Sequence, residues 1–469
     1  MEKKSILIRA TPSPLDKFTV AEAWKFNLIH NNSGNVAFPY GLIRNLTSSN
    51  VKVDSDWYGH RLPSPDEVNE RYSHYILPMA NDLGQHFESE MKRLTSYISK
   101  LKIPVVVVGI GGAFGTSDKF DTPKPFDSTV KRFFNEVLER SQTVGLRGHI
   151  TAKYMESLGF KEGSHFRVIG DPTLYNCGRD LDIKPFELTA YSRIAYNMTP
   201  TAPMGSLRFL NRLAVQFENA EYIAQDLGDL TKMYSGILDP TFSVQRESIE
   251  EYPNGLRDYP FTSGKSSMYL TAPSWIAAME DFDLSIGTRI HGNILPTHAG
   301  VPTVTLSFGS RLTELVEFHS LPHVDASSID EKQDLRDVLE RVDLQSPVSA
   351  HPGNFDNFLE FLAENSIENQ YDLPTGANVR EFDRLYSLVT PMEPVRPIVS
   401  CKSVDEVAER LALGQEIVAP RIIEQKLRMV RLANEVRQLR PKVRSIEEMS
   451  DTERLKLMRT VIDVMEQTF

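Results

Sequence analysis

Cysteine is scarce in this chain of 469 residues, and the two that occur form no recognisable motif. Cys177 and Cys401 lie far apart in the sequence and belong to no Cys-x-x-Cys or Cys/His ligand spacing. A disulfide scaffold and a structural zinc site are therefore both disfavoured. So little cysteine suits a reducing compartment, and we expect a soluble, cytoplasmic protein.

Long apolar runs and an excess of positive charge are also lacking. No stretch reaches the ~20 apolar residues that a membrane helix needs, so we expect no membrane span. The apolar run at 6–8 is too short for the core of a signal peptide. The sequence has 52 basic and 63 acidic residues and a net charge of -11. This balance argues against nucleic acid as a partner but permits a local basic pocket for a small anion.

What the sequence does contain is an alternation of strand and helix patterns. Because 469 residues exceed what one hydrophobic core supports, the alternation predicts two doubly wound α/β domains, at 1–182 and 190–330. The continuous β-branched run 103–108 is typical of a strand buried on both faces of a parallel sheet. Further strands are expected at 5–9, 143–147, 166–169, 193–197, 222–225, 284–286 and 302–306, with a less definite stretch near 268–271.

The remaining part of the chain, 331–469, is predicted to be a mainly helical C-terminal extension. Helix candidates lie at 421–440 and 445–467, and spaced apolar residues such as Ile423 and Leu427 give the first of them an apolar face. We interpret it as a terminal helix folded back on the body of the protein. The alternative is a helix through which copies of the chain associate into a homo-oligomer.

A glycine-rich segment follows the strand at 103–108, where open α/β sheets bring backbone N–H groups to phosphates and substrates. The segment, 109–115, is no Walker loop, because no Gly-Lys-Ser/Thr follows. It also has Phe114 where a dinucleotide fingerprint needs its third Gly or Ala. Gly111 and Gly112 favour a close backbone approach to a ligand, and an ordinary strand-to-helix turn is the alternative.

A second strand-end segment reads Gly287-Thr288-Arg289-Ile290-His291-Gly292. It precedes a helix, so its N–H groups and the helix dipole favour an anion. Arg289 offers a planar fork for carboxylate or phosphate, and His291 can titrate near neutral pH. In an extended segment both would face the same side, with Arg289 lining solvent rather than core. A surface arginine beside a histidine bonded to a backbone carbonyl is the alternative.

Other strand-end residues are candidates for the same site. Arg147 ends a strand of the first domain and can face Arg289 across a cleft, although a solvated strand-end arginine is equally consistent with its position. Arg311 lies in the loop after the strand at 302–306 and is a third cation for the same anion. We interpret Asp171 as a structural residue of a turn, with an acid/base role as the alternative.

Taken in order, these segments resemble the polysaccharide pyruvyl transferase family. The resemblance covers about residues 1–324 and rests on Gly34-Asn35, Gly109-Ile110-Gly111-Gly112, Leu146-Arg147, Asp171-Pro172, the block from Ser285 to Gly292, His298-Ala299-Gly300-Val301-Pro302 and Arg311. It implies two Rossmann-like halves with the site in the cleft between them, similar to the GT-B glycosyltransferases.

The resemblance also assigns residues to roles. Arg289 and His291 match the Arg-Leu-His donor motif of the family, with Ile290 in place of Leu. The family often has Ser-x-Arg-Asp where this chain has Gly145-Leu146-Arg147-Gly148, so the task of that Asp is missing or taken over elsewhere. The implied donor-binding residues are Arg147, Gly287, Thr288, Arg289, His291 and Arg311, and the implied substrate-binding residues are Asn35, Gly111 and Gly112.

The implied reaction moves the pyruvyl group of phosphoenolpyruvate onto two hydroxyls of a saccharide, forming a pyruvate ketal in surface polysaccharide or glycan biosynthesis. A donor with a carboxylate and a phosphate needs two or more cations to hold it. His291 is the candidate general acid and base, while Arg289, helped by Arg147 or Arg311, would stabilise the departing phosphate. The scheme requires no cofactor and no metal. Lipid-linked and polymeric saccharides both stay open as acceptors.

Two other functions fit the same pattern. A GT-B-type glycosyltransferase with a sugar-nucleotide donor would need an acidic residue for the ribose hydroxyls, and Glu314 is a candidate. A non-catalytic saccharide-binding or scaffold protein would retain the fold without the reaction. Gly148 at the position of the family Asp, together with the long charged C-terminal third, favours that second alternative.

Overall fold

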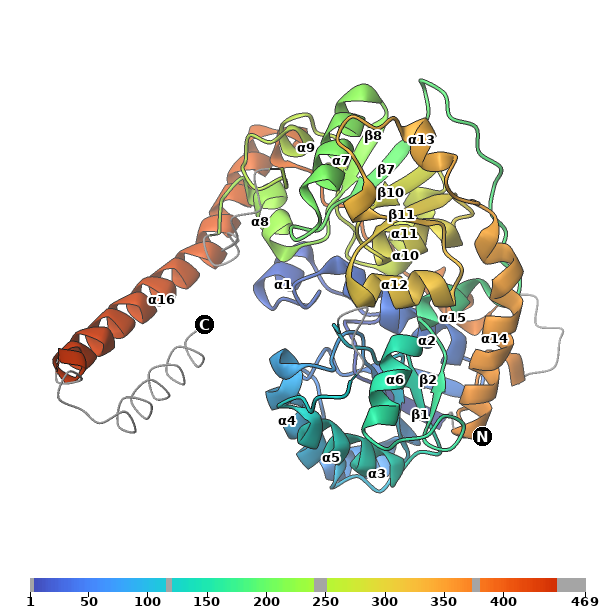
Figure 1. The fold of residues 1–469 in the computed structure, drawn as a ribbon. Helices are drawn as coiled ribbons and strands as arrows, with labels where there is room; N and C mark the ends of the chain where they lie inside the picture. The colour runs from blue at the N-terminus through green and yellow to red at the C-terminus, as the bar shows by residue number, and fades with distance from the viewer. Residues whose placement is uncertain (1–3, 115–119, 240–250, 373–379, 445–469) are drawn as a thin grey trace.

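Two α/β halves, one above the other in Figure 1, make up the body of the protein. The computed structural model describes residues 4–114, 120–239, 251–372 and 380–444. The N-terminal half contains β1 (Lys4–Ile8), β2 (Val51–Ser55), β3 (His74–Pro78), β4 (Val105–Val108), β5 (Val144–Leu146) and β6 (Phe166–Val168). Its helices are α1 (Val20–Lys25), α2 (Ala37–Leu46), α3 (Pro65–Arg71), α4 (Glu88–Ile98), α5 (Asp127–Leu138) and α6 (His149–Ser157).

The strands of this half are parallel and follow the order β2-β1-β3-β4, after which β5 and β6 continue the array. A parallel bridge between Ile110 and Leu146 joins β4 to β5. All four valines of β4 are fully buried, as the continuous β-branched run predicts for a strand covered on both faces. The order reverses between β1 and β3, so the half is doubly wound.

The C-terminal half has a six-stranded sheet in the order β12-β11-β10-β7-β8-β9, again with parallel neighbours. Its strands are β7 (Ile194–Asn197), β8 (Ala220–Ile223), β9 (Ser266–Ser267), β10 (Leu284–Gly287), β11 (Thr303–Ser307) and β12 (His323–Asp325). Its helices are α7 (Met204–Gln216), α8 (Leu227–Ser235), α9 (Tyr259–Thr262), α10 (Ala272–Met279), α11 (His291–His298) and α12 (Gly309–Phe318). The reversal between β7 and β10 is the switch point at which ligands bind in such sheets.

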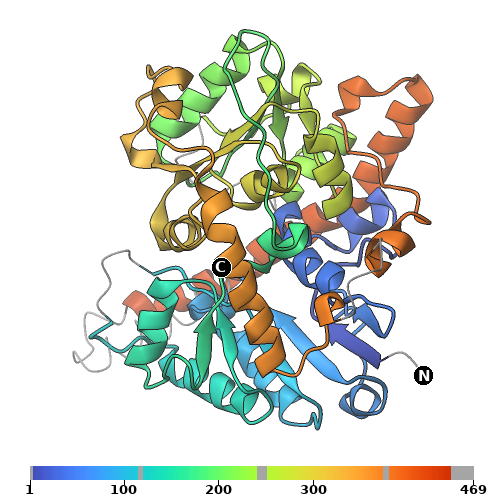
Figure 2. The same ribbon diagram turned by 90° about the vertical axis from the view of Figure 1, so that its right-hand side faces the viewer.

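The last part of the chain is mainly helical, so the predicted fold class, two doubly wound domains with a helical C-terminal extension, is confirmed. The extension consists of α13 (Leu335–Leu339), α14 (Ser346–Glu364), α15 (Glu381–Tyr386) and α16 (Val404–Arg444). Figure 2 shows α14 running from the C-terminal half down along the N-terminal half. Its Phe358 ring stacks on Tyr175 at 4.6 Å, and Glu364 forms an ion pair with Arg167. The extension therefore contributes to the packing of the N-terminal half.

Several sequence expectations need correction. The stretch near 268–271 is not a strand, since β9 ends at Ser267 and the backbone of Met268 pairs instead with Val395. The edge strand β12 at His323–Asp325 was not predicted. Two further strands, β2 and β3, were not predicted, although Val51-Lys52-Val53-Asp54 in β2 alternates apolar and polar residues.

The helix expected at 421–440 lies within the longer helix α16, and only the beginning of α16 packs on the body. Arg421 bonds to Asp239, and Gly414 packs against Ser235 of α8. Beyond that point Ile423 and Leu427 are exposed and the helix extends away from both halves (Figure 1). The folded-back interpretation is thus wrong for this part, while association of copies through it stays a prediction. The helix candidate at 445–467 lies outside the described residues.

A buried histidine gives the fold a testable pH dependence. Burial lowers the pKa of His319 to about 3, and its Nε2 accepts a hydrogen bond from the backbone N–H of Asp171 at 2.8 Å. Because a histidine in the unfolded chain titrates near 6.5, the unfolded state binds the extra proton between about pH 6.5 and pH 3. The native state is therefore fully favoured above pH 6.5 and loses stability as the pH falls through this window.

We expect His319→Gln, which retains an acceptor for the Asp171 N–H, to weaken this dependence. Between pH 6 and pH 4 the free energy of unfolding should fall by about 1.4 kcal/mol per pH unit less in the variant than in the wild type. Urea unfolding at a series of pH values measures the difference. Parallel curves for the two proteins would contradict the assignment of His319 as a buried neutral histidine.

Candidate functional site

A cavity of about 350 Å³ lies between the two halves, at the β7–β10 switch point. The loop that precedes α2 and the loop after β4 line its N-terminal side, and the loops after β7, β8, β10 and β11 line the other side. The lining residues are Asn32, Asn35, Ala113, Phe114, Thr199, Thr201, Gln225, Thr288, Arg289, Ile290, His291, Phe308, Gly309, Ser310, Arg311 and Leu312. The carboxyl ends of both parallel sheets thus meet at one ligand-sized space.

Arg147 ends β5 directly behind the N-terminal wall of this cavity. Its backbone N–H donates to Ile110 O at 2.9 Å, which fixes the start of its side chain against the end of β4. The side chain is 1% exposed, and none of its three guanidinium nitrogens has a hydrogen-bond partner among the described residues. Its guanidinium carbon lies 5.9 Å from the centre of the Phe38 ring. A buried guanidinium without hydrogen bonds is costly, and a bound anion is the natural partner for it.

Arg311 approaches the same region from the first turn of α12. The helix follows Gly309, whose φ of +67° lets the chain turn sharply after β11. Burial, together with the charges of Arg147 and Arg289, lowers the pKa of Arg311 to about 10, so it remains charged at neutral pH. Its Nε, like the Oγ1 of Thr288 and the Nε2 of Gln225, is buried without a partner among the described residues.

Arg289 lies in the cavity wall, but it does not line solvent as the sequence suggested. Its Nε donates to Met198 O at 2.6 Å, and its Nη2 forms a short ion pair with Asp226. Although burial alone would lower its pKa, Asp226 and the neighbouring Tyr252 hold the pKa of Arg289 above its ordinary value. The charge of Arg289 is therefore already compensated. Removing this side chain would affect stability as well as ligand binding, because it leaves the carboxylate without its ion partner.

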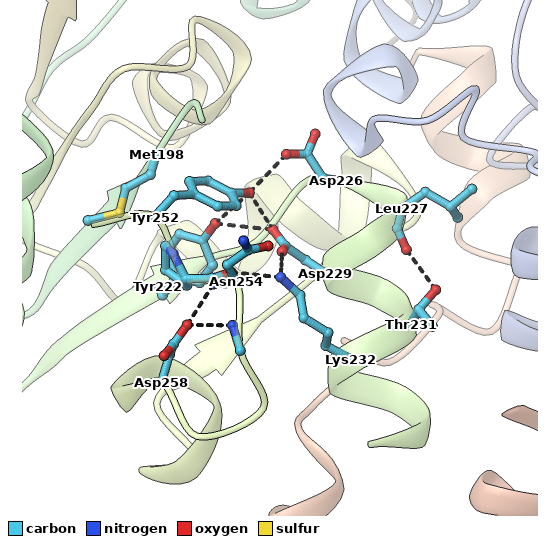
Figure 3. A network of polar contacts seen from close by, with 12 residues as sticks. Met198, Tyr222, Asp226, Leu227, Asp229, Thr231, Lys232, Tyr252, Asn254 and Asp258 are labelled. Carbon is cyan, nitrogen blue, oxygen red and sulfur yellow. Dashed lines mark hydrogen bonds and ion pairs between the residues drawn. The ribbon is translucent and has the colours of Figure 1, made fainter. Parts of the chain in front are cut away.

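Asp226 belongs to a buried polar network at the start of α8, shown in Figure 3. The Tyr252 hydroxyl lies 2.8 Å from a carboxylate oxygen of both Asp226 and Asp229, and Tyr222 lies 3.1 Å from Asp229. Lys232 forms an ion pair with Asp229 at 2.8 Å. Burial raises the pKa of Asp226, and the charge of Arg289 opposes that shift. This network fixes Arg289 and with it the loop after β10.

His291 and Asp171 form a pair that bridges the two halves. The Nε2 of His291, at the start of α11, lies 3.1 Å from Oδ2 of Asp171, which follows β6. Asp171 is fully buried, yet its hydrogen bond to His291 and the charges of His291 and Arg147 keep its pKa below the usual range despite that burial. An ionised carboxylate only accepts, so the proton lies on Nε2 and Nδ1 is the basic nitrogen. The pair can hold and move a proton at Nδ1.

From the sequence we expected an extended segment at 288–291, but the structure shows that this segment is not extended throughout. Ile290 has φ -59° and ψ -49°, which is helical backbone, and α11 begins at His291. Arg289 and His291 nevertheless both line the cavity. The bend occurs because Asn197 accepts from the backbone N–H of Arg289 at 2.7 Å and draws the chain toward β7.

The profile of the polysaccharide pyruvyl transferase family matches residues 32–310. This chain belongs to the polysaccharide pyruvyl transferase family. The resemblance inferred from the sequence is therefore confirmed, and the family supports a transferase that acts in polysaccharide pyruvylation in general. No curated protein matches the chain.

Solved structures of other proteins are similar to this family member only in broad outline. A UDP-GlcNAc 2-epimerase from Methanocaldococcus jannaschii matches with 12% identity and a TM-score of 0.40, covering 77% of this chain and 99% of the epimerase. A UDP-GlcNAc 2-epimerase from Neisseria meningitidis matches with 11% identity and a TM-score of 0.38, covering 77% and 100%. A heptosyltransferase from E. coli matches with 10% identity and a TM-score of 0.24, covering 72% and 98%. With TM-scores this low, the fold assignment depends on the two sheets described above.

The remaining site residues predicted for this pyruvyl transferase family member are distributed between the cavity and the packing around it. Asn35 and Thr288 line the cavity. A side chain at position 287 would collide with Asn197, because a Cβ built on Gly287 would lie 2.3 Å from Asn197 O. Gly111 leaves room for Arg147, whereas Gly112 packs against the Phe114 ring. The loop position 115 lies outside the described residues.

Sequence reasoning missed several polar residues around the cavity. Asn197 is the last residue of the buried strand β7 and Gln225 follows β8, and their strand-end position was the available signal. Asp171 was interpreted as structural, and it does cap the turn by accepting from Thr173 N–H at 2.9 Å. Its contact with His291 adds a second role that only the meeting of the two halves reveals.

No helix within the described ranges is both long enough and apolar enough to cross a membrane.

The uncompensated charge of Arg147 predicts that removing it has two opposite effects, a gain in stability of the ligand-free protein and a loss of anion binding. Arg147→Met should raise the free energy of unfolding of the ligand-free protein by about 1 kcal/mol, because a side chain of similar volume replaces a buried, unbonded charge. We expect inorganic phosphate to raise the melting temperature of the wild type, and the same change should abolish this rise. Thermal unfolding with and without phosphate measures both effects.

Arg132→Met, on the exposed face of α5, is the matched control and should change neither quantity. A variant at Arg147 that is less stable than the wild type and still responds to phosphate would show that Arg147 has a structural role.

Proposed function

We propose that this chain transfers the pyruvyl group of phosphoenolpyruvate to a saccharide and forms a pyruvate ketal. The observation that supports this most is the meeting of two cations with the Asp171-oriented His291; the guanidinium of Arg147 and the Nε of Arg311 lack hydrogen-bond partners among the described residues. Phosphoenolpyruvate presents two anionic groups on a small frame, and bidentate guanidinium contacts suit both. The family of the chain supports the same reaction type.

The proposed chemistry balances without further reactants. Protonation of the methylene carbon creates a methyl group and an oxocarbenium-like centre at C2, which a saccharide hydroxyl attacks. The bond from C2 to the phosphate oxygen then breaks, and a second hydroxyl closes the ketal. The two hydroxyls release two protons, of which one ends on the new methyl group and the other on phosphate. Donor, acceptor and general acid/base are sufficient.

The residues divide this work between them. His291 exchanges protons through Nδ1, while Asp171 fixes the ring and stabilises its protonated form. Arg147 and Arg311 hold the donor anion and stabilise the charge that develops on the departing phosphate. Arg289, neutralised by Asp226, positions the loop and contributes donors to the wall of the cavity. The acceptor is a saccharide, and we expect it to enter from the open side of the cavity.

A sugar-nucleotide glycosyltransferase is the principal alternative. Its expected acidic residue, Glu314, is 2% exposed, and both of its carboxylate oxygens accept from the Thr151 hydroxyl at 3.0 Å. The carboxylate is thus buried between the halves and is not among the residues that line the cavity, so ribose hydroxyls there would not reach it. Titration calorimetry with phosphoenolpyruvate and with UDP-sugars separates the two functions. We expect heat from phosphoenolpyruvate, and heat only from a UDP-sugar would contradict the proposal.

The His291–Asp171 pair predicts a separation of binding from turnover. Asp171→Asn keeps the size of the side chain and an acceptor for Thr173, but it removes the charge that orients and stabilises the imidazole. Phosphate release from phosphoenolpyruvate should fall by about 100-fold or more, in the range of general acid–base catalysis. Donor affinity measured by calorimetry should change little, because the cations that hold the anion remain.

Turnover unaffected by Asp171→Asn would exclude the pair from the reaction. Phosphate release that is absent from the wild type with every candidate sugar, despite donor binding, would favour the non-catalytic saccharide-binding alternative.

A further inference from the structure

The start of helix α6 lacks a capping side chain of its own. Gly148 occupies the N-cap position, directly after Arg147, and makes no side-chain hydrogen bond. Its φ of -171° and ψ of 179° are extended backbone that any residue adopts. The usual cap at such a position is a Ser, Thr, Asp or Asn whose oxygen accepts from the N–H two or three residues later. Something other than conformation must account for glycine here.

A carboxylate from the other half of the molecule takes the place of that cap. Glu314, on α12, accepts from the backbone N–H of Thr151, the third residue of α6, at 3.1 Å and also from its hydroxyl. A Cβ built on Gly148 would lie 2.8 Å from the Cβ of Glu314 and 2.9 Å from its Oε2. The glycine and the glutamate therefore fit each other, since any side chain at 148 collides with Glu314.

The same carboxylate borders the buried guanidinium of the donor site. A Cβ built on Gly111 would lie 2.9 Å from Cδ of Arg147 and 3.0 Å from Oε1 of Glu314, so both side chains border one small space. Burial raises the pKa of Glu314, and the positive charge of Arg147 opposes that rise. Helices α12 and α6 face each other at the junction of the halves (Figure 1). One carboxylate thus connects the two halves beside Arg147.

We propose that Glu314 is a positioning residue which, from the C-terminal half, supplies the carboxylate that Gly148 cannot, and thereby holds α6 and Arg147 in place across the cleft. The proposal rests on the proposed function only because that function names phosphoenolpyruvate as the anion that Arg147 binds. Arg147 directly precedes the cap of α6, so release of the first turn of α6 moves the guanidinium that should grip the anion.

The test moves the carboxylate to position 148. Four proteins are compared: the wild type, Glu314→Ala, Gly148→Asp, and a double variant with Gly148→Asp and Glu314→Gly, in which no Cβ remains at 314 to collide with the new side chain. Glu317→Ala, one turn further along α12 on its exposed side, is the matched control. Thermal unfolding reports the cap, while phosphate release from phosphoenolpyruvate and the affinity for inorganic phosphate report the position of Arg147.

Each single change should be harmful, since one removes the cap and the other forces two carboxylates together. Glu314→Ala should lower turnover about tenfold and weaken phosphate binding by a similar factor, as expected for the loss of about 1.4 kcal/mol of positioning. The double variant should recover both quantities to within about threefold of the wild type, which additive effects could not produce. Glu317→Ala should behave as the wild type.

Two results would overturn the proposal. In the first, the folded Glu314→Ala protein has wild-type turnover and phosphate affinity. In the second, the double variant recovers the melting temperature but neither activity nor phosphate affinity, which would make Glu314 a structural cap only. If the wild type does not turn over phosphoenolpyruvate, the proposed function fails, and the phosphate affinities of the same four proteins still decide the role of Glu314.

Discussion

The site depends on one constraint, a positive charge buried at the end of β5 with no hydrogen-bond partner in the described part of the chain. Arg147 is almost completely shielded from water; its guanidinium carbon lies near the Phe38 ring, and its charged neighbours include Glu314 and Arg311. Such a charge opposes folding unless something bound returns the lost solvation. Proteins keep features of this kind where activity needs them, at a cost in stability. Gly111 leaves the space that the Arg147 side chain occupies, and the carboxylate of Glu314 lies close enough to interact with its charge.

The cations around the cavity differ in what they are free to do. Arg289 is paired with Asp226 inside a network of tyrosines and a lysine, so it acts as a fixed part of the wall. Arg147 and Arg311 retain donors without partners among the described residues, and their mutual repulsion contributes to the lowered pKa of Arg311. Two nearby cations that repel each other are stabilised by an anion placed between them. That is a suitable environment for a small, multiply charged donor.

The two halves meet through polar bonds on every side of this anion site. Asp171 contacts His291, the Oγ of Ser310 accepts from Phe114 N–H at 2.9 Å, and Glu314 caps α6. Each bond joins a residue of the N-terminal half to a residue of the C-terminal half. The relative position of the halves therefore determines both the proton-transfer pair and the cation pair. A change that loosens the junction should act on the site even where it touches no ligand.

The sequence predicts the sheets and the strand-end loops because β-branched runs and turn residues are local signals. It also predicts that Arg147, His291 and Arg311 gather, since parallel strands end at a common edge. The partners of these residues could not be predicted in the same way. Asp226 and Arg289 are 63 positions apart, and Thr151 and Glu314 are 163 apart. The first pair depends on how two loops within the C-terminal half pack, and the second depends on how the two halves dock. The exposure of Ile423 and Leu427 on α16 was not predicted for a related reason. An apolar helix face in the sequence does not reveal whether another part of the protein covers it.

The most direct test of this account is a crystal structure of the protein with phosphoenolpyruvate bound. We predict that the donor lies in the cavity between the halves, with its anionic groups within about 3 Å of the guanidinium nitrogens of Arg147 and Arg311. The Nδ1 of His291 should face the methylene carbon. A donor bound outside this cavity, or one held by Arg289 alone while Arg147 stays without a partner, would contradict the central claim.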